Sequence, residues 1–248
     1  MRALVVVPTY QEAENVTQFL EQVRRIVPDC DILLVDDDSP DGTGELAEKA
    51  GADLGQIEVL HRQAKQGLGS AYRAGFGQGL AAGYEIIVQM DCDFSHDPAA
   101  LPRLIAPVDA GHADCTVGSR YVPGGSTPDW PLHRRMLSKY GNLYTARLLE
   151  LGIHDATSGF RAYHADTLRR IQFDTTEANG YAFQTELAYR MVQHGSRIVE
   201  VPITFVDRAF GVSKMSARII SESMALVTLW GLKARLARLA GRTRPAAR

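Results

Sequence analysis

The stretch that decides the fold is residues 85–97, with the sequence EIIVQMDCDFSHD. Its first part, Ile86–Met90, is apolar apart from one glutamine and alternates little, which is typical of a buried strand. Two carboxylates, Asp91 and Asp93, follow where this strand is expected to end. Because ligands of open α/β sheets bind at the carboxyl ends of the strands, the stretch predicts both the fold class and the place of a site.

Asp91 and Asp93 are separated by a single residue, so their carboxylates repel each other unless a cation lies between them. A hard divalent ion with oxygen ligands, carrying a substrate phosphate, is one candidate. The other interpretation is an acidic loop that caps the helix beginning at Asp97-Pro98. The Asp-x-Asp pattern alone does not choose between the two.

The segments before this stretch alternate between strand-like and helix-like patterns. Apolar runs predict strands at 3–7, 32–35, 57–60 and 85–90, with a helix in each interval. This order predicts an α/β fold: one mostly parallel sheet with right-handed crossovers and helices on both faces. Polar clusters follow the first, second and fourth strands, so we expect them to meet at one edge of the sheet.

The second half of the chain continues the alternation after a helix at 98–110. A strand is expected at 113–117, and a loop rich in Gly and Pro at 122–131 is long enough to bind a ligand. Further elements are expected to be a helix at 132–150, a strand entered through 157–163, a helix at 181–194 and a strand at 198–206.

The composition excludes several classes of protein. A chain of 248 residues with 45% hydrophobic and 23% charged residues is an ordinary globular protein. Its net charge of −2 argues against nucleic acid as the main partner. The cysteines, Cys30, Cys92 and Cys115, form no C-x-x-C motif, which favours a reducing compartment without a metal-thiolate site. The apolar run at 3–7 is too short for a signal peptide, so we expect a cytoplasmic location.

The C-terminal segment differs in character from the rest. Residues 223–232 carry no charge but have half the length needed to span a bilayer. From Lys233 onward there are six basic residues and no acidic one. An amphipathic helix lying on an anionic membrane surface and a core-packing helix with a solvated tail fit equally well. We therefore expect a catalytic domain at 1–214 and a C-terminal helix with a basic tail at 215–248.

Three familiar motifs are approximated in the chain. Residues 36–48 approach a calcium loop, but a strand precedes them and Gly44 occupies an apolar position. Gly67-Leu68-Gly69 begins like a dinucleotide fingerprint, but Tyr72 replaces its third glycine. Asp91–Ser95 resembles the motif of aspartyl-phosphate-forming phosphatases, a rival from another reaction class. That motif normally lies on the first strand, whereas three strands precede it here. The phosphatase interpretation also leaves the loops at 8–12 and 36–43 without a role.

Basic residues are expected at the same edge of the sheet as the carboxylates. Arg120 ends a strand, Arg134 follows the Gly- and Pro-rich loop, and Arg208 and Lys214 flank a Gly-Ser turn. Each could be a solvated surface charge. Together they suit a site that holds a metal, a diphosphate and a second phosphate.

Seven motifs in order resemble one family, the polyprenol (dolichol) monophosphate mannose synthases within family 2 of the inverting glycosyltransferases. The resemblance runs from about residue 4 to 215. It implies a GT-A fold in a single α/β domain, GDP-mannose as donor and a polyprenyl phosphate as acceptor. The motifs are Pro8-Thr9-Tyr10-x-Glu12, Val35-Asp36-Asp37-x-Ser39-x-Asp41-Gly42-Thr43, Asp91-x-Asp93, Gly118-Ser119-Arg120-Tyr121, Trp130-Pro131-x-x-Arg134, Ser158-Gly159-Phe160 and Arg208-x-x-Gly211-x-Ser213-Lys214.

The resemblance also implies roles for individual residues. Residues implied to bind the nucleotide sugar are Pro8, Tyr10, Glu12, Val35, Asp37, Asp91, Cys92, Asp93, Ser95, Arg120, Arg208 and Lys214. The implied acceptor-phosphate residues are Arg120, Arg134 and Ser158. The implied ligands of Mg²⁺ or Mn²⁺ are Asp91, Asp93 and Ser95, and the implied catalytic residues are Asp93, Arg208 and Lys214. Ser95 departs from the glutamine that is frequent in the family, so a water can replace direct ligation there.

The implied reaction is a single displacement at the anomeric carbon. The acceptor phosphate is largely anionic near pH 7, its second pKa being ~6, so no general base is needed. Without a spanning segment, the protein is expected to be peripheral on the cytoplasmic face of a membrane, held by its C-terminal helix or by an integral membrane partner. Two alternatives remain: a related family 2 transferase that uses UDP-glucose or another nucleotide sugar, and the aspartyl-phosphate-forming phosphatase.

Overall fold

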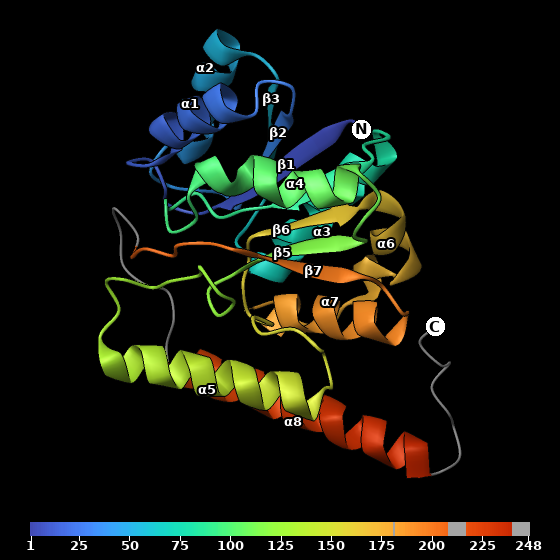
Figure 1. Ribbon diagram of the computed structural model, residues 1–248. Coiled ribbons are helices and arrows are strands. Elements are labelled where there is room, and N and C mark those ends of the chain that lie inside the picture. Colours follow the sequence, from blue (N-terminus) through green and yellow to red (C-terminus); the bar gives the residue numbers. More distant parts are fainter. Residues whose placement is uncertain (181, 208–216, 240–248) are drawn as a thin grey trace.

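The computed structural model of the chain describes residues 1–180, 182–207 and 217–239. The described part contains one seven-stranded sheet of order β3-β2-β1-β4-β6-β5-β7 (Figure 1). The strands are β1 (Ala3–Thr9), β2 (Asp31–Asp36), β3 (Ile57–His61), β4 (Ile86–Gln89), β5 (Cys115–Ser119), β6 (Arg161–His164) and β7 (Ile198–Pro202).

The sheet is parallel except at β6. β1 pairs in parallel with β2 and β4, whereas β6 runs antiparallel to both of its neighbours, β4 and β5. In the register of β1, Thr9 lies opposite Asp36 and Val6 lies opposite Gln89. The chain therefore leaves β1, β2 and β4 at one edge, as the sequence predicts.

Helices cover both faces of the sheet. They are α1 (Val16–Ile26), α2 (Thr43–Leu54), α3 (Leu68–Ala81), α4 (Leu101–Asp109), α5 (Leu132–Leu148), α6 (Ala165–Arg170), α7 (Ala182–Gln193) and α8 (Ala217–Leu239). Short 3₁₀ turns occupy Pro98–Ala100 and Phe173–Thr175. The expected α/β class with helices on both faces is confirmed.

Alternation along the strands divides the apolar core between the two faces. Val5 and Val7 of β1 pack with α1, α2 and α4, and Leu4 and Val6 pack with α3 and α7. All four side chains are buried, as expected for a strand covered on both sides. This double burial holds the carboxyl ends of the strands in fixed positions.

Helices α5 and α8 lie side by side as an outer layer beneath α7 (Figure 1). Val227 of α8 reaches the core, and the ring of Trp230 stacks on Tyr189 of α7 with centroids 6.5 Å apart. The Tyr144 and Thr228 hydroxyls are 2.9 Å apart and join α5 to α8. Among the described helices, none combines the length and apolar character needed to cross a membrane.

Several boundaries differ from the sequence-based expectations. β7 ends at Pro202, which lacks an amide donor, and only isolated bridges continue the expected strand 198–206. β5 lies two residues later than the expected 113–117, and α6 was not expected. The expected helix after residue 215 is present as α8. The division between 1–214 and 215–248 falls among residues 208–216, outside the described part of the chain, and stays a prediction.

Candidate functional site

A cavity of about 620 Å³ opens at the carboxyl ends of β1, β2 and β4. Its walls come from the turns after these strands, the start of α3, the loop before α7, and α8. The described residues that line it are Pro8, Thr9, Tyr10, Glu12, Asp37, Lys65, Gly67, Leu68, Ala71, Asp91, Cys92, Asp93, Glu177, Ala178, Asn179, Gly180, Ala182, Ser223 and Leu226.

The cavity brings together seven of the residues predicted to bind the nucleotide sugar. These are Pro8, Tyr10, Glu12, Asp37, Asp91, Cys92 and Asp93. Val35 lies opposite Pro8 in the sheet but is fully buried in the core, so its side chain is not among the lining groups. Arg208 and Lys214 fall outside the described residues.

The acidic turn after β4 is tightly ordered. The Oδ1 atom of Asp93 accepts hydrogen bonds from the Ser95 amide (3.1 Å) and the Ser95 hydroxyl (2.5 Å). Oδ1 of Asp91 accepts a hydrogen bond of 3.1 Å from the Tyr72 hydroxyl. Phe94, between the two halves of the turn, has a φ of +59°. Ser95 therefore orients the Asp93 carboxylate, and its role as a metal ligand stays a prediction.

Behind this turn lies the buried residue His96. Its ring stacks on Phe160 with centroids 5.0 Å apart, and its Nδ1 accepts a 3.4 Å hydrogen bond from the Asp91 amide. Burial lowers the pKa of His96 to about 4, so the ring is neutral near pH 7. A neutral ring can accept a hydrogen bond from the Asp91 amide, and this bond fixes the backbone of the acidic turn.

The Ser158-Gly159-Phe160 motif supports the same turn from the neighbouring strand entry. A Cβ atom at Gly159 would lie 3.6 Å from Oδ2 of Asp91, so this backbone runs beside the carboxylate. The Ser158 side chain is buried, and its hydroxyl accepts the Phe160 amide at 3.3 Å. Ser158 does not line the cavity. Its predicted contact with an acceptor phosphate stays a prediction.

The two carboxylates at the end of β2 have different surroundings. Asp36 is buried and accepts hydrogen bonds from the Thr9 hydroxyl (2.9 Å) and the Ser39 hydroxyl (2.6 Å). Asp37 reaches the cavity and pairs with Arg62 at 2.5 Å. The calcium-like pattern is thus a hydrogen-bonded turn that presents Asp37.

The loop before α7 forms a cavity wall that sequence reasoning missed. Arg73 of α3 donates hydrogen bonds to the carbonyl oxygens of Thr176 (3.2 Å) and Ala178 (3.1 Å), and to the Asn179 side chain. The buried Glu186 carboxylate accepts the amides of Glu177 (3.0 Å) and Ala178 (2.9 Å). The wall is therefore held from both sides.

One sequence signal for this wall was present in Gly67-Leu68-Gly69. Gly67 has a φ of +93°, and a Cβ there would lie 2.6 Å from the Asn179 carbonyl oxygen. A Cβ at Gly69 would lie 2.4 Å from the Ala178 carbonyl oxygen. These glycines allow two backbones to touch, which is one of the few uses that require glycine.

The predicted arginines Arg120 and Arg134 lie together outside the cavity lining. Arg120 makes two hydrogen bonds of 2.7 Å to the buried Asp155, and Arg134 pairs with Asp207 at 2.7 Å. Their guanidinium carbons lie 5.6 and 4.2 Å from the centroid of the Trp130 ring, in cation–π contact. Trp130 thus joins the two predicted acceptor-phosphate arginines in one cluster.

A divalent ion fits the oxygen groups of the acidic turn. Within the described ranges, no group of three or more His, Cys, Asp or Glu side chains forms a metal cage. Mg²⁺ is commonly bound by one or two carboxylates together with substrate phosphates and water. Asp91 and Asp93 are two carboxylates at one cavity, and their chemistry matches that kind of site.

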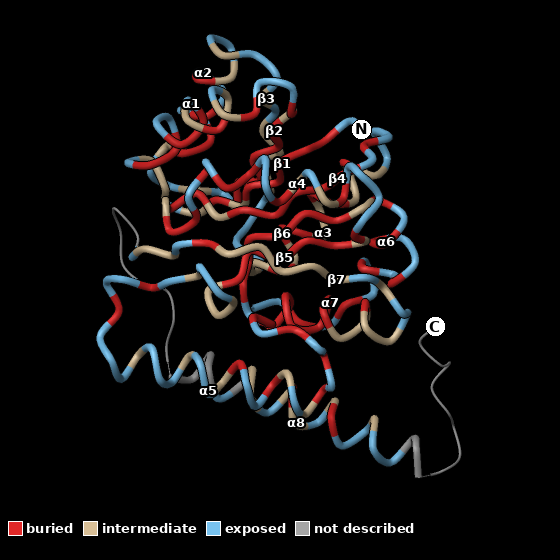
Figure 2. Tube along the Cα trace, in the orientation of Figure 1, coloured by how far each residue is buried: buried red, intermediate tan, exposed pale blue. Residues whose placement is uncertain are grey.

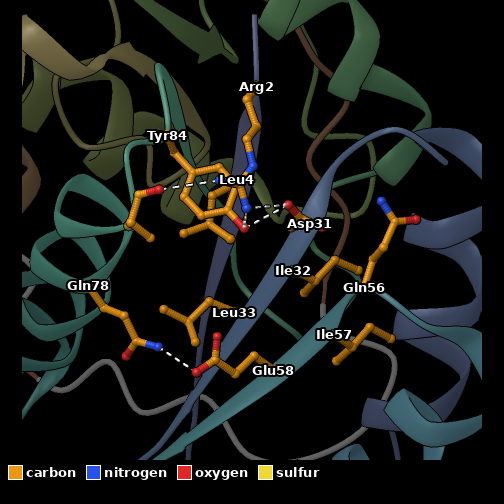
Figure 3. A pocket seen from close by; sticks show the side chains of 12 residues that line it. Arg2, Leu4, Asp31, Ile32, Leu33, Gln56, Ile57, Glu58, Gln78 and Tyr84 are labelled. Atoms are coloured by element: carbon orange, nitrogen blue, oxygen red, sulfur yellow. Dashed lines mark hydrogen bonds and ion pairs between the residues drawn. The ribbon is translucent and has the colours of Figure 1, made fainter.

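A second cavity, of about 290 Å³, lies at the amino ends of β1, β2 and β3 (Figure 3). Arg2 lies over the Tyr84 ring, 4.0 Å from its centroid, and the Tyr84 hydroxyl donates a 2.6 Å hydrogen bond to Asp31. Glu58 accepts from Gln78 at 2.7 Å. Most polar side chains of this second cavity thus bond to one another, and the cavity lies at the opposite edge of the sheet from the acidic turn.

The fold and the principal cavity define a glycosyltransferase of the GT-A type. Residues 4–172 match the family described as Glycosyl transferase family 2, and the chain belongs to that family. The expected family is confirmed, and membership favours glycosyl transfer over the aspartyl-phosphate chemistry.

Two relatives align over almost the whole chain. An undecaprenyl-phosphate mannosyltransferase from Micrococcus luteus is 50% identical over 95% of this chain and 96% of its own length. A polyprenol monophosphomannose synthase from Mycolicibacterium smegmatis is 49% identical over 97% of this chain and 91% of its own.

Solved structures at low identity share the fold. Mannosyl-3-phosphoglycerate synthase from Rubrobacter xylanophilus is 18% identical with a TM-score of 0.68, covering 100% of this chain and 77% of its own. A mannosyltransferase from Pyrobaculum calidifontis in complex with GDP-Man and Mn²⁺ is 15% identical with a TM-score of 0.59, covering 97% and 74%.

Proposed function

We propose that this protein transfers mannose from GDP-mannose to a polyprenyl phosphate with inversion, releasing GDP. The observation that carries the proposal is the gathering of Tyr10, Glu12, Asp37, Asp91 and Asp93 in one cavity at the carboxyl edge. The two relatives near 50% identity, named for mannosyl transfer to polyprenol phosphates, support the acceptor and the sugar.

In this proposal each turn of the cavity has its own part in donor binding. The turns after β1 and β2 supply Tyr10, Glu12 and Asp37 to the guanosine. Asp91 and Cys92 face the ribose and diphosphate, and Asp93 is the firmer metal ligand. Arg208 and Lys214, which are not among the residues that the structure describes, are proposed to bind the diphosphate as well.

The proposed cofactor is Mg²⁺ or Mn²⁺, held by Asp91 and Asp93 and by Ser95 directly or through water. When bound, such an ion neutralises the diphosphate that leaves with GDP. The Pyrobaculum calidifontis neighbour, whose complex holds GDP-Man and Mn²⁺, supports a divalent ion in this fold. The chain's own part is to hold Asp93 in place through Ser95 and to hold Asp91 through Tyr72.

The acceptor phosphate is placed near Arg120, Arg134 and Ser158. One of its oxygens forms the new bond to the anomeric carbon while the bond from that carbon to the donor diphosphate breaks. The phosphate is already anionic near pH 7, so no residue needs to remove a proton. His96, with a pKa of about 4, is suited to hold the acidic turn and not to act as a base near pH 7.

The proposed place of action is the cytoplasmic face of a membrane, reached through the α5–α8 layer. Apolar side chains on this layer are unusually exposed, including Leu132 (68%), Leu137 (60%) and Leu236 (65%). α5 also carries Arg134, Arg135, Lys139 and Arg147 and no acidic residue. Exposed apolar groups with cations suit an anionic bilayer surface. The alternative to a bilayer surface on this face is an integral membrane partner.

The test is to incubate the protein with radiolabelled GDP-mannose, Mg²⁺ and a polyprenyl phosphate, and then to extract the lipid. We expect label in the lipid phase only when acceptor and metal are both present. Parallel reactions with UDP-glucose examine the related transferase. Lipid labelling from UDP-glucose but not GDP-mannose would overturn the donor assignment.

A further inference from the structure

Negatively charged side chains predominate among the described residues that line the cavity, and the proposed ligand is also negatively charged. Among its described lining residues there are five carboxylates, and Lys65 provides the single side-chain cation. The carboxylates are Glu12, Asp37, Asp91, Asp93 and Glu177. A nucleoside diphosphate is itself anionic, so cations must offset both sets of charge. Asp37 is paired with Arg62, whose side chain is not among the lining groups. Lys65 is therefore the cation among the described lining residues whose charge can act directly on an anionic ligand.

The loop that carries Lys65 is fixed on both sides. Arg62 pairs with Asp37 at 2.5 Å, and the Gln66 amide donates to the same carboxylate at 3.2 Å. Directly after them, Gly67 and Gly69 lie against the backbone of residues 178–179. Because the backbone around position 65 is held so firmly, the Lys65 side chain starts from a defined point at the cavity wall.

The side chain itself is exposed and weakly held. Its ammonium lies 3.8 Å from the centroid of the Tyr10 ring, in a cation–π contact. Cation–π contacts at exposed sites are among the weaker interactions of a cation, whereas an ammonium–phosphate contact is a charge-assisted hydrogen bond. An anionic ligand in the cavity can therefore draw the ammonium away from the ring.

We propose that Lys65 binds the diphosphate of the donor and rests on the Tyr10 ring when the cavity holds no nucleotide. The inference rests on the proposed function, in that it takes the ligand to be a nucleoside-diphosphate sugar. Movement of the ammonium also uncovers the face of Tyr10, one of the residues proposed to contact the nucleoside. Lys65 is thus a donor-binding residue whose charge acts on the phosphates and not on the base.

The test compares GDP with guanosine, because the two ligands differ only in the phosphates. Titration calorimetry with Mg²⁺ is carried out on the wild type, Lys65→Met and Lys65→Arg, with Lys49→Met as the matched control. Lys49 is an exposed lysine of α2 that does not line the cavity. Lys65 is exposed too, so its replacement leaves the packed core unchanged.

We expect Lys65→Met to weaken GDP binding about 10- to 100-fold, the range for loss of a hydrogen bond to a charged group. Guanosine binding stays within about twofold of the wild type on that scale. Lys65→Arg retains most of the GDP affinity, and Lys49→Met changes neither. Equal losses for GDP and guanosine, an equal loss in Lys49→Met, or no loss at all would each overturn the proposal.

The same titrations with UDP and uridine separate this inference from the donor assignment. If the wild type binds UDP and not GDP, the GDP-mannose proposal fails. The comparison at Lys65 then uses UDP and uridine, with the same expected difference between diphosphate and nucleoside.

Discussion

The cavity at the carboxyl edge of the sheet and the α5–α8 layer depart from the usual distribution of residues in opposite directions. At the cavity, polar groups are buried: Asp93 is 7% exposed and is held by Ser95. On the outer layer, apolar groups are exposed, and Leu132 reaches 68%. Figure 2 shows the contrast along the chain, with buried central strands and a largely exposed α5. Buried polar groups and exposed apolar groups are the observations that point to function.

The largest expected effect concerns the acidic turn. Asp93→Ala should reduce mannose transfer by about a thousandfold or more, because the charge developing on the leaving diphosphate loses its main neutralising site. The radiolabelled lipid assay measures this loss. The nearby Asp97→Ala is the control: Asp97 is exposed and caps the turn at Ala99, so its loss affects stability by about 1 kcal/mol and leaves transfer intact. Near-normal turnover in Asp93→Ala would refute the metal assignment.

The next effect concerns Asp155, the buried partner of Arg120. Burial alone would raise the pKa of Asp155, but the charge and hydrogen bonds of Arg120 hold it below its usual value. A carboxyl with a lowered pKa in the folded state stabilises the fold above its unfolded pKa of about 3.9 and loses that contribution as the pH falls through the folded pKa. Urea titrations should therefore show stability falling below about pH 4.

Asp155→Asn tests this assignment directly. It should lower the free energy of unfolding by about 3–5 kcal/mol at pH 7, because Arg120 stays buried without its charge partner. The decline below about pH 4 should also be shallower in the variant than in the wild type. Parallel pH profiles for the two proteins would contradict this assignment.

A smaller effect is expected on the outer layer. Leu137→Glu should weaken binding to anionic vesicles about tenfold, since it replaces an exposed apolar contact by a charge that the lipid repels. Its unfolding free energy should change by no more than about 0.5 kcal/mol. Leu46→Glu is the matched variant, because Leu46 is an exposed leucine of α2, away from this layer. Sedimentation with vesicles measures the affinity of both variants. Equal losses of vesicle affinity would show that α5 does not contact the membrane.

The last comparison, on stability alone, distinguishes the cavity wall from open helix surface within α3. Gly69→Ala should destabilise the protein by about 1–3 kcal/mol, because the added methyl group meets the Ala178 carbonyl oxygen. Gly77→Ala has open space around it and should stabilise the helix by about 0.5–1 kcal/mol. Thermal unfolding of both variants checks the sign of each change. A stabilising effect of Gly69→Ala would show that the backbone at residues 178–179 can move to accommodate the added methyl group.

The parts of the site that lie next to strands could be predicted from sequence. Asp37, Asp91 and Asp93 lie within a few residues of the ends of apolar runs, and parallel pairing places their turns at one edge. The wall at 177–180 could not be found in this way, because tertiary contacts with Arg73, Glu186 and the Gly67–Gly69 backbone bring it to the cavity. No periodicity in the sequence encodes such contacts.

The buried charges were equally hidden. Arg120 is predicted to meet the acceptor phosphate, which stays a prediction, and the sequence gives no sign that Asp155, 35 residues later, accepts two of its side-chain hydrogen bonds. Arg161 lies fully buried and donates to the carbonyl oxygens of Ala156, Ser158 and Gln184. An arginine in a sequence reads as a surface residue unless its partners are known.

Helix α8 belongs to both regions at once. Ser223 and Leu226 line the cavity at the carboxyl edge, while Leu229 and Leu232 are exposed on the outer layer. A surface that holds the outer side of this helix therefore also fixes one wall of the proposed nucleotide site. Thermodynamic linkage makes such an effect reciprocal: the factor by which a membrane alters nucleotide affinity equals the factor by which nucleotide alters membrane affinity. Nucleotide in the cavity would then change the affinity of the protein for the lipid surface by that same factor.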